Sequence, residues 1–181
     1  MSVESAAVRL QSTALSQTLQ AADWVVPTMQ TIHILMIGVV FVSILMIALR
    51  VLGWVRADEP FARVWRRFTP FLWTGLTVMA VTGLLLTLAE PVREVMALSF
   101  RIKMLLLVIG IGSAIAFGRS VGNAARVATG MEPAFSSAVR AAALLTIVLW
   151  LIIIFLGRSI AYDNSVWGDW SPAVLQRGAA P

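Results

Sequence analysis

Long apolar stretches separated by short charged segments set the pattern of this chain. Each stretch has the roughly 20 residues that a helix needs to cross about 30 Å of hydrocarbon. Strands of a membrane barrel alternate apolar and polar residues, whereas these stretches are apolar almost throughout. The pattern predicts an all-α, integral membrane four-helix bundle with spans at about 28–52, 70–89, 100–121 and 139–160.

Two segments flank the predicted bundle, which covers residues 28–162. The first, 1–27, predicts an outward-facing amphipathic helix on the membrane surface. The second, 163–181, predicts an outward-facing tail rich in tryptophan, a residue typical of the membrane interface. The residues that indicate this are Val8, Leu15 and Leu19 in the first segment and Tyr162, Trp167 and Trp170 at the second.

The connection between the first two spans carries another amphipathic pattern. Its apolar residues follow i, i+3, i+4 and i+7 spacing and are Phe61, Val64, Trp65 and Phe68. Arginines occupy the other face, while Asp58 and Pro60 suit the start of a helix. We expect a short interfacial helix at the level of the lipid headgroups. A dedicated protein-docking or lipid-binding site is the alternative.

Composition supports the membrane prediction and removes several kinds of chemistry. The chain is 59% hydrophobic and 13% charged, whereas soluble domains are about half apolar and a quarter charged. The lack of cysteine excludes disulfides, thiolate metal sites and iron–sulfur clusters. The single histidine, His33, leaves no histidine pair for a metalloprotease site. No nucleophile and base stand at a suitable spacing, which disfavours an enzyme.

The net charge of +5 is distributed unevenly over the predicted loops. Eight of the 14 basic residues lie in the two loops on one side of the membrane: Arg50, Arg56, Arg63, Arg66, Arg67, Arg119, Arg126 and Arg140. Basic loops stay in the cytoplasm, so both termini are expected to face outward from a bacterial inner membrane. The positive charge is then explained by topology and does not indicate a nucleic-acid partner.

The third span carries small residues at every fourth position. These residues are Gly110, Ala114, Gly118 and Gly122. Small side chains let two helix backbones approach closely in lipid. The stripe predicts close packing inside the bundle, with an interface in a homo-oligomer or a larger membrane complex as the alternative.

Polar residues near the outward ends of the spans form a predicted layer. Its members are Gln30, His33, Glu90, Arg101, Lys103, Arg158 and Asp163. Ionisable groups inside a membrane are costly and commonly mark functional sites. All four spans contribute to this layer, so it is the best candidate site in the sequence. Ordinary anchoring of helix ends at the interface is the competing interpretation.

Met29, His33 and Met36 stand at i, i+4 and i+7 on the first span and therefore share a face. Thioether and imidazole groups together suit Cu(I) and also serve as axial ligands of haem. Methionine is equally a common filler of apolar interfaces. Copper and haem b are therefore both open as cofactors, beside a purely packing role.

Several strings of the chain resemble a family of small four-span bacterial inner-membrane proteins without an assigned function. They are IHILMIGVVFVSILMIALRVLG, FTPFLWTGLTVMAVTGLLLTLAEP, SFRIKMLLLVIGIGSAIAF and LWLIIIFLGRSIAY. That family is loosely similar to the membrane domain of copper-resistance protein D. The resemblance implies a copper role for His33 and, by position, for Lys103. Our chain lacks the Met-rich or His-rich outward loop that captures copper.

The sequence favours a non-enzymatic multipass membrane protein with a polar site on its outer side. That site would bind a metal or small ligand, or the chain would act as a subunit of a membrane complex. A haem-binding, cytochrome-like electron carrier that uses His33 is the first alternative. A small transporter or channel is the second, although no charge or helix break lies at the predicted membrane midplane.

Overall fold

Four long helices dominate the computed structural model, which describes residues 3–127 and 135–172, with the backbone alone for 120–127. They are α3 (Val25–Leu52), α4 (Phe61–Ala89), α6 (Leu98–Val127) and α7 (Ser137–Ser159). Each contains a stretch long and apolar enough to cross a membrane. The described residues contain no strand, and the predicted all-α membrane four-helix bundle is confirmed.

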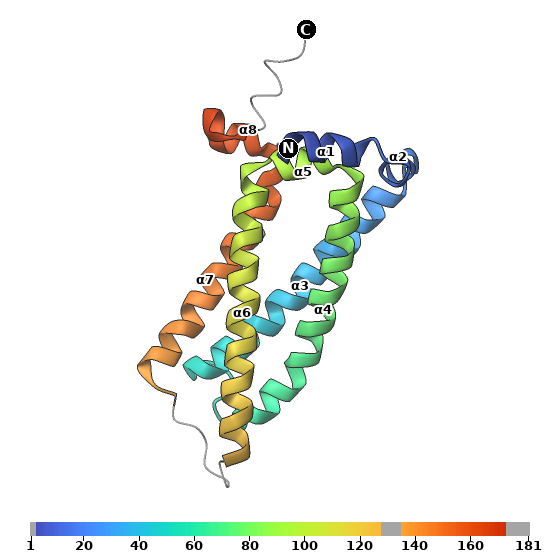
Figure 1. Cartoon of the computed structure of the whole chain (residues 1–181). Coiled ribbons are helices and arrows are strands. Elements are labelled where there is room, and N and C mark those ends of the chain that lie inside the picture. Colours follow the sequence, from blue (N-terminus) through green and yellow to red (C-terminus); the bar gives the residue numbers. More distant parts are fainter. Residues whose placement is uncertain (1–2, 128–134, 173–181) are drawn as a thin grey trace.

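Short helices gather at one end of the bundle, which we call the α5 end (Figure 1). They are α1 (Val3–Gln11), α2 (Ala14–Ala21), α5 (Pro91–Met96), η1 (Ile160–Tyr162), α8 (Asp163–Trp167) and η2 (Gly168–Trp170). The turn from α3 into α4 lies at the opposite end, which we call the Glu59 end. The four long helices therefore connect one end that is covered by short helices with another that holds the turn between α3 and α4.

Local sequence explains where the long helices begin and end. Gly53 closes α3 in the left-handed conformation, with φ of 76°, and its N–H donates to the carbonyl of Arg50 at 3.1 Å. Glycine adopts this conformation without a steric penalty. Pro60 precedes the first residue of α4. Ser136 caps α7, because its Oγ accepts from the N–H of Val139 at 3.4 Å.

The centre of the bundle is organised around α3, which packs along both α4 and α7, while α6 packs mainly on α7. The core here consists of Val40, Ile44, Leu72, Leu76, Trp150 and Ile153. Gly75 on α4 allows the closest approach, since a Cβ there would lie 2.7 Å from Cγ2 of Val40 on α3. The small residue at this crossing therefore sets how tightly α3 and α4 pack.

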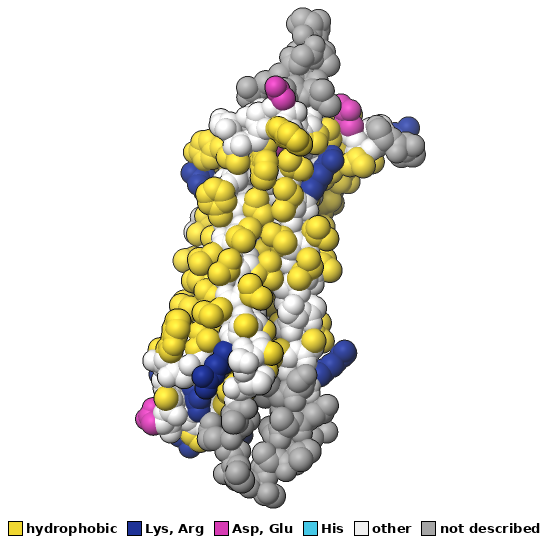
Figure 2. Space-filling view, turned by 90° about the vertical axis from the view of Figure 1, so that its left-hand side faces the viewer, with side chains coloured by type: hydrophobic (Ala, Val, Ile, Leu, Met, Phe, Trp, Pro, Cys, Tyr) yellow, Lys and Arg dark blue, Asp and Glu magenta, His cyan; other side chains and the backbone are white. Residues whose placement is uncertain are grey.

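Hydrophobic side chains cover the flank of the bundle, and charged side chains lie near its two ends (Figure 2). Leu105 and Val108 on α6 are 64% and 67% exposed, and Leu145 on α7 is 69% exposed. An apolar flank of this kind suits hydrocarbon, which cannot hydrogen-bond with polar groups. The exposed residues of the spans are thus explained by lipid contact.

The predicted separate helix between the first two spans is continuous with the second span. Phe61, the first residue of α4, is 2% exposed, and Val64 is fully buried. The ring of Phe61 packs edge-on against Phe117 of α6, 6.2 Å between centroids, and lies 6.1 Å from that of Trp65. The apolar positions were identified correctly, but they face a second part of the core rather than the headgroups. They do so because α3 and α6 offer an apolar surface at the same level.

The N-terminal segment forms two helices, α1 and α2, and Val8 and Leu15 of the predicted apolar face point away from the rest of the protein. Val8 and Leu15 are 52% and 56% exposed, whereas Ala7 and Ser16 are buried. α1 lies against α5, and α2 lies against the end of α4. Small side chains face the protein here because they allow close contact, which leaves the larger apolar ones on the outside.

Neighbours within the chain occupy the space beside two glycines of the predicted stripe. A Cβ at Gly110 would lie 3.6 Å from side-chain atoms of Leu149 and Trp150 on α7, and one at Gly118 would lie 3.2 Å from Trp65 on α4. The remaining stripe positions are Ala114, which lines an apolar cavity, and Gly122, which lies outside the residues whose side chains are described. A subunit interface stays a prediction.

Candidate functional site

His33 lies in the third turn of α3 and makes a specific contact with α4. Its Nδ1 is 2.8 Å from the hydroxyl of Thr82, and that hydroxyl donates to the carbonyl of Val78 at 2.8 Å. A hydroxyl has one hydrogen to donate. When that hydrogen goes to Val78, the ring donates from Nδ1–H, and the lone pair of Nε2 is available to another group; when it goes to Nδ1, the hydrogen of the neutral ring lies on Nε2.

Close packing holds the His33 ring in place. A Cβ at Gly83 on α4 would lie 3.2 Å from Cε1 of the ring. Glycine is thus the residue that lets the imidazole lie flat against α4. Thr82 and Gly83 together orient the ring from one turn of one helix.

Lys103 brings α6 and α7 to the same region. Its side chain is half-buried, and its Cδ is 3.7 Å from where a Cβ at Gly157 of α7 would lie. The ammonium stands over the ring of Phe100, 5.2 Å from the centroid, and lies within range of the charge of His33. Among the described residues, the ammonium has no hydrogen bond and no ion pair within 4.0 Å. Its charge is therefore only partly compensated.

Glu94 of α5 belongs to the same region and was not predicted from the sequence. Burial raises the pKa of Glu94 above its ordinary value, and the positive charges of Lys103 and Arg93 oppose that shift. The only sequence feature that could have indicated Glu94 is its position as a carboxyl group in the short connection after Pro91, between two spans. The sequence does not show that this connection folds back onto the bundle as a helix.

The other predicted members of the polar layer are exposed or have partners close by in the sequence. Gln30 is exposed. Glu90 forms an ion pair with Arg93. Arg101 is exposed and donates from Nε to the carbonyl of Val95 at 2.9 Å. Arg158 donates to the hydroxyl of Tyr162 at 3.2 Å. These local contacts at helix ends agree with the interpretation that the residues anchor the helices.

Asp163, the last predicted member, has a structural role. It is 5% exposed, and its two carboxylate oxygens accept from the N–H groups of Leu98 at 3.0 Å and Ser99 at 2.9 Å. The hydroxyl of Ser171 donates to the same carboxylate. Asp163 therefore caps the start of α6 from the far end of the chain, and its oxygens are already occupied.

The ligands available for a metal are few. The described residues contain no group of three His, Asp or Glu side chains that could hold a metal ion. Met29 and Met36 lie half-buried on α3, one turn before and one turn after His33. For copper or haem iron, the chain offers Nε2 of His33 together with these thioethers. Lys103, which lies within electrostatic range of His33, is a cation and opposes the binding of another cation there.

Two cavities flank this region without coinciding with it. One of about 270 Å³ opens between α5 and α8 and is lined by Arg93, Tyr162 and Asn164 among others. The second, of about 140 Å³, is apolar and lies nearer the Glu59 end, where Ile47, Trp65 and Phe117 line it. Neither lining includes His33 or Lys103. His33, Thr82, Lys103 and Glu94 thus lie outside these two cavities, and we call this group the His33–Lys103 site.

Comparisons of the chain with protein-family models, with curated protein sequences and with solved structures found no match.

Proposed function

We propose that this chain is a non-enzymatic multipass protein of a bacterial inner membrane that binds a small anionic ligand at its outward-facing α5 end. The observation that carries the proposal is that the side chain of Lys103 is half-buried. Within the part of the chain that the structure describes, its ammonium has no hydrogen-bond or ion-pair partner. Removing a charge from water is costly unless it is paired. A carboxylate or phosphate group of a ligand would supply that pair.

His33 adds a second element of recognition. In the tautomer in which Nδ1–H donates to Thr82, Nε2 of the neutral ring accepts a hydrogen bond and does not donate one. A ligand that carries a hydroxyl as well as an anionic group offers a partner to each of the two residues. The ligand class we favour is therefore a small hydroxy acid or a hydroxyl-bearing phosphate rather than a simple inorganic anion.

The test compares glycolate, which has a hydroxyl, with acetate and inorganic phosphate in thermal unfolding of the detergent-solubilised protein. We expect glycolate to stabilise the wild-type chain more than acetate does. Lys103→Met should weaken the apparent affinity at least about tenfold, since a charge-assisted hydrogen bond contributes about 1.5–3 kcal/mol. His33→Ala should remove the advantage of glycolate over acetate.

Arg101→Gln is the matched control, because Arg101 is an exposed base two residues away on the same helix. An equal loss of affinity in Lys103→Met and Arg101→Gln would contradict the proposal. The proposal would also be contradicted if none of the three anions stabilised the wild-type protein. A Soret absorption band or bound copper in protein purified from membranes, lost in His33→Ala, would replace it with the haem or copper alternative.

The proposed orientation has its own test, which the absence of cysteine makes simple. Ser12 between α1 and α2 and Asp58 between α3 and α4 are both exposed. In intact cells, a membrane-impermeant maleimide should label Ser12→Cys. It should label Asp58→Cys only after the membrane is permeabilised. The reverse pattern would place the α5 end in the cytoplasm.

A further inference from the structure

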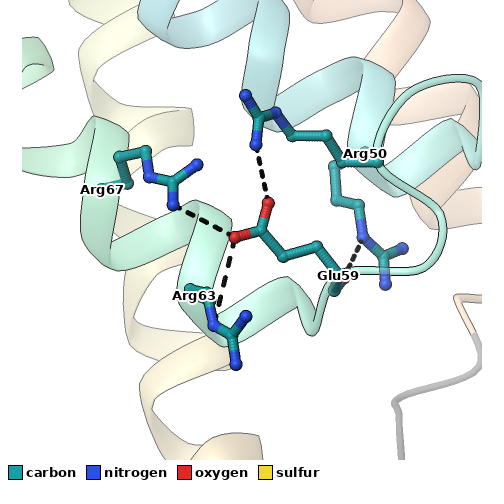
Figure 3. A network of polar contacts seen from close by, with 5 residues as sticks. Arg50, Glu59, Arg63 and Arg67 are labelled. Carbon is teal, nitrogen blue, oxygen red and sulfur yellow. Dashed lines mark hydrogen bonds and ion pairs between the residues drawn. The ribbon is translucent and has the colours of Figure 1, made fainter.

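A network of arginines surrounds Glu59 at the opposite end of the bundle, in the turn between α3 and α4 (Figure 3). Arg50 lies in the last turn of α3, and Arg63 and Arg67 follow one another by one turn near the start of α4. Both helices are candidate membrane spans. The network therefore lies at the ends of two candidate membrane spans.

One carboxylate organises three of the guanidinium groups. Oε2 of Glu59 lies 2.9 Å from Nη1 of Arg56, while Oε1 lies 3.3 Å from Nη2 of Arg67 and 4.0 Å from Nε of Arg63. The Arg56 hydrogen bond and the positive charges around it hold the pKa of Glu59 below its ordinary value. Glu59 is thus an anion across the physiological pH range.

The backbone of the same residue ties the network to α3. Nε of Arg50, a residue that is 7% exposed, donates to the carbonyl of Glu59 at 2.8 Å. This contact fixes the turn relative to the helix before it. The guanidinium groups are consequently held together by the fold and do not depend on a ligand for their arrangement.

Positive charge exceeds negative charge in this network. Among the described residues, the carboxylate of Glu59 forms ion pairs with three arginines, and the side chains of Arg56, Arg63 and Arg67 are 42%, 62% and 45% exposed, whereas that of Glu59 is 12% exposed. Each guanidinium has five N–H donors, so exposed donors remain after the contacts with Glu59. Trp54, 68% exposed at the same end, is a residue type typical of the membrane interface.

We infer that the Glu59 network binds the phosphate group of an anionic phospholipid. The planar guanidinium matches a phosphate with two parallel hydrogen bonds. Basic clusters beside membrane spans attract anionic lipids. Glu59 serves to hold the arginines in one place while leaving their outer donors exposed. This site is separate from the His33–Lys103 site and does not depend on it.

Native mass spectrometry of the detergent-solubilised protein with phosphatidylglycerol or phosphatidylcholine tests the inference. The wild-type chain should retain phosphatidylglycerol in preference to phosphatidylcholine. The double variant Arg63→Gln with Arg67→Gln should bind phosphatidylglycerol about thirtyfold more weakly, since each of the two bases near the membrane surface contributes about 1 kcal/mol. Both side chains are exposed, so the fold should persist.

The matched control is Arg119→Gln with Arg140→Gln, which removes the same charge from exposed positions toward the same end of α6 and α7. Retained binding in this control supports a defined site. An equal loss in both double variants, or equal retention of the two lipids by the wild-type chain, would overturn the inference. Displacement of the lipid by millimolar inorganic phosphate would show that a free anion is the ligand, and would also overturn it.

Discussion

Asp163→Ala is expected to destabilise the chain by about 3 kcal/mol, because hydrogen bonds to a charged group contribute about 1.5–3 kcal/mol and unsatisfied buried donors add a further cost. The substitution leaves the N–H groups of Leu98 and Ser99 at the start of α6 without their acceptor. Ser99 is fully buried, and its Oγ accepts from the indole of Trp167 at 2.8 Å. Losing the cap should therefore release the α8 segment as well.

Thermal unfolding in detergent measures this effect. A loss of 3 kcal/mol corresponds to a fall of about 6–12 °C in Tm for a chain of this size. Asp163→Asn should fall between wild type and Asp163→Ala, because the amide keeps one acceptor oxygen. Asp169→Ala, at an exposed aspartate of η2, should leave Tm unchanged. Equal effects of the Asp163→Ala and Asp169→Ala substitutions would contradict the capping role.

Gly75→Leu is expected to destabilise the bundle by about 2–3 kcal/mol through overpacking. A Cβ at Gly75 would already lie 2.7 Å from Cγ2 of Val40, which is fully buried. Valine is stiff at χ1, so it cannot rotate out of the way, and the carbonyl of Met36 lies 3.8 Å from the same position. The leucine must push α3 and α4 apart. In lipid, helix association depends on such close contacts.

Gly112→Leu is the matched control, because nothing lies within 4 Å of a Cβ at Gly112 on α6. It makes the same chemical change on a lipid-facing surface and should keep the wild-type Tm. When Val40→Ala is combined with Gly75→Leu, it should recover part of the stability that Gly75→Leu loses. The double-mutant cycle then measures an interaction energy between the two residues. Simple additivity of the two changes would contradict a direct clash.

The fold could be predicted in most of its parts. The spans predicted at about 28–52 and 139–160 correspond to α3 and α7, which end within a few residues of those limits. The helix that contains the second predicted span begins before residue 70, because Pro70 lies inside α4, which begins at Phe61. Pro70 and the arginines before it suggest that the helix starts only at residue 70. The helix begins at Phe61 instead, where Phe61 and the aromatic residues after it pack in the core.

The candidate site was predicted in outline only. His33 and Lys103 were both in the predicted layer, and in the structure the charge of Lys103 acts on His33. Glu94 was missed, because its burial depends on how α5 folds onto the bundle. Asp163 was assigned to the site although it caps α6, since nothing in the sequence near residue 163 reveals a partner so distant.

The sequence alone determined that this protein consists of four apolar helices, because lipid cannot satisfy backbone hydrogen bonds and each span must satisfy its own. It also determined that the few charged residues lie near the ends. Only the tertiary structure decided which polar groups meet: His33 pairs with Thr82, 49 residues away, and Asp163 reaches Ser99 across 64 residues. Helix formation depends on local apolar length, whereas these partners depend on which helices pack side by side.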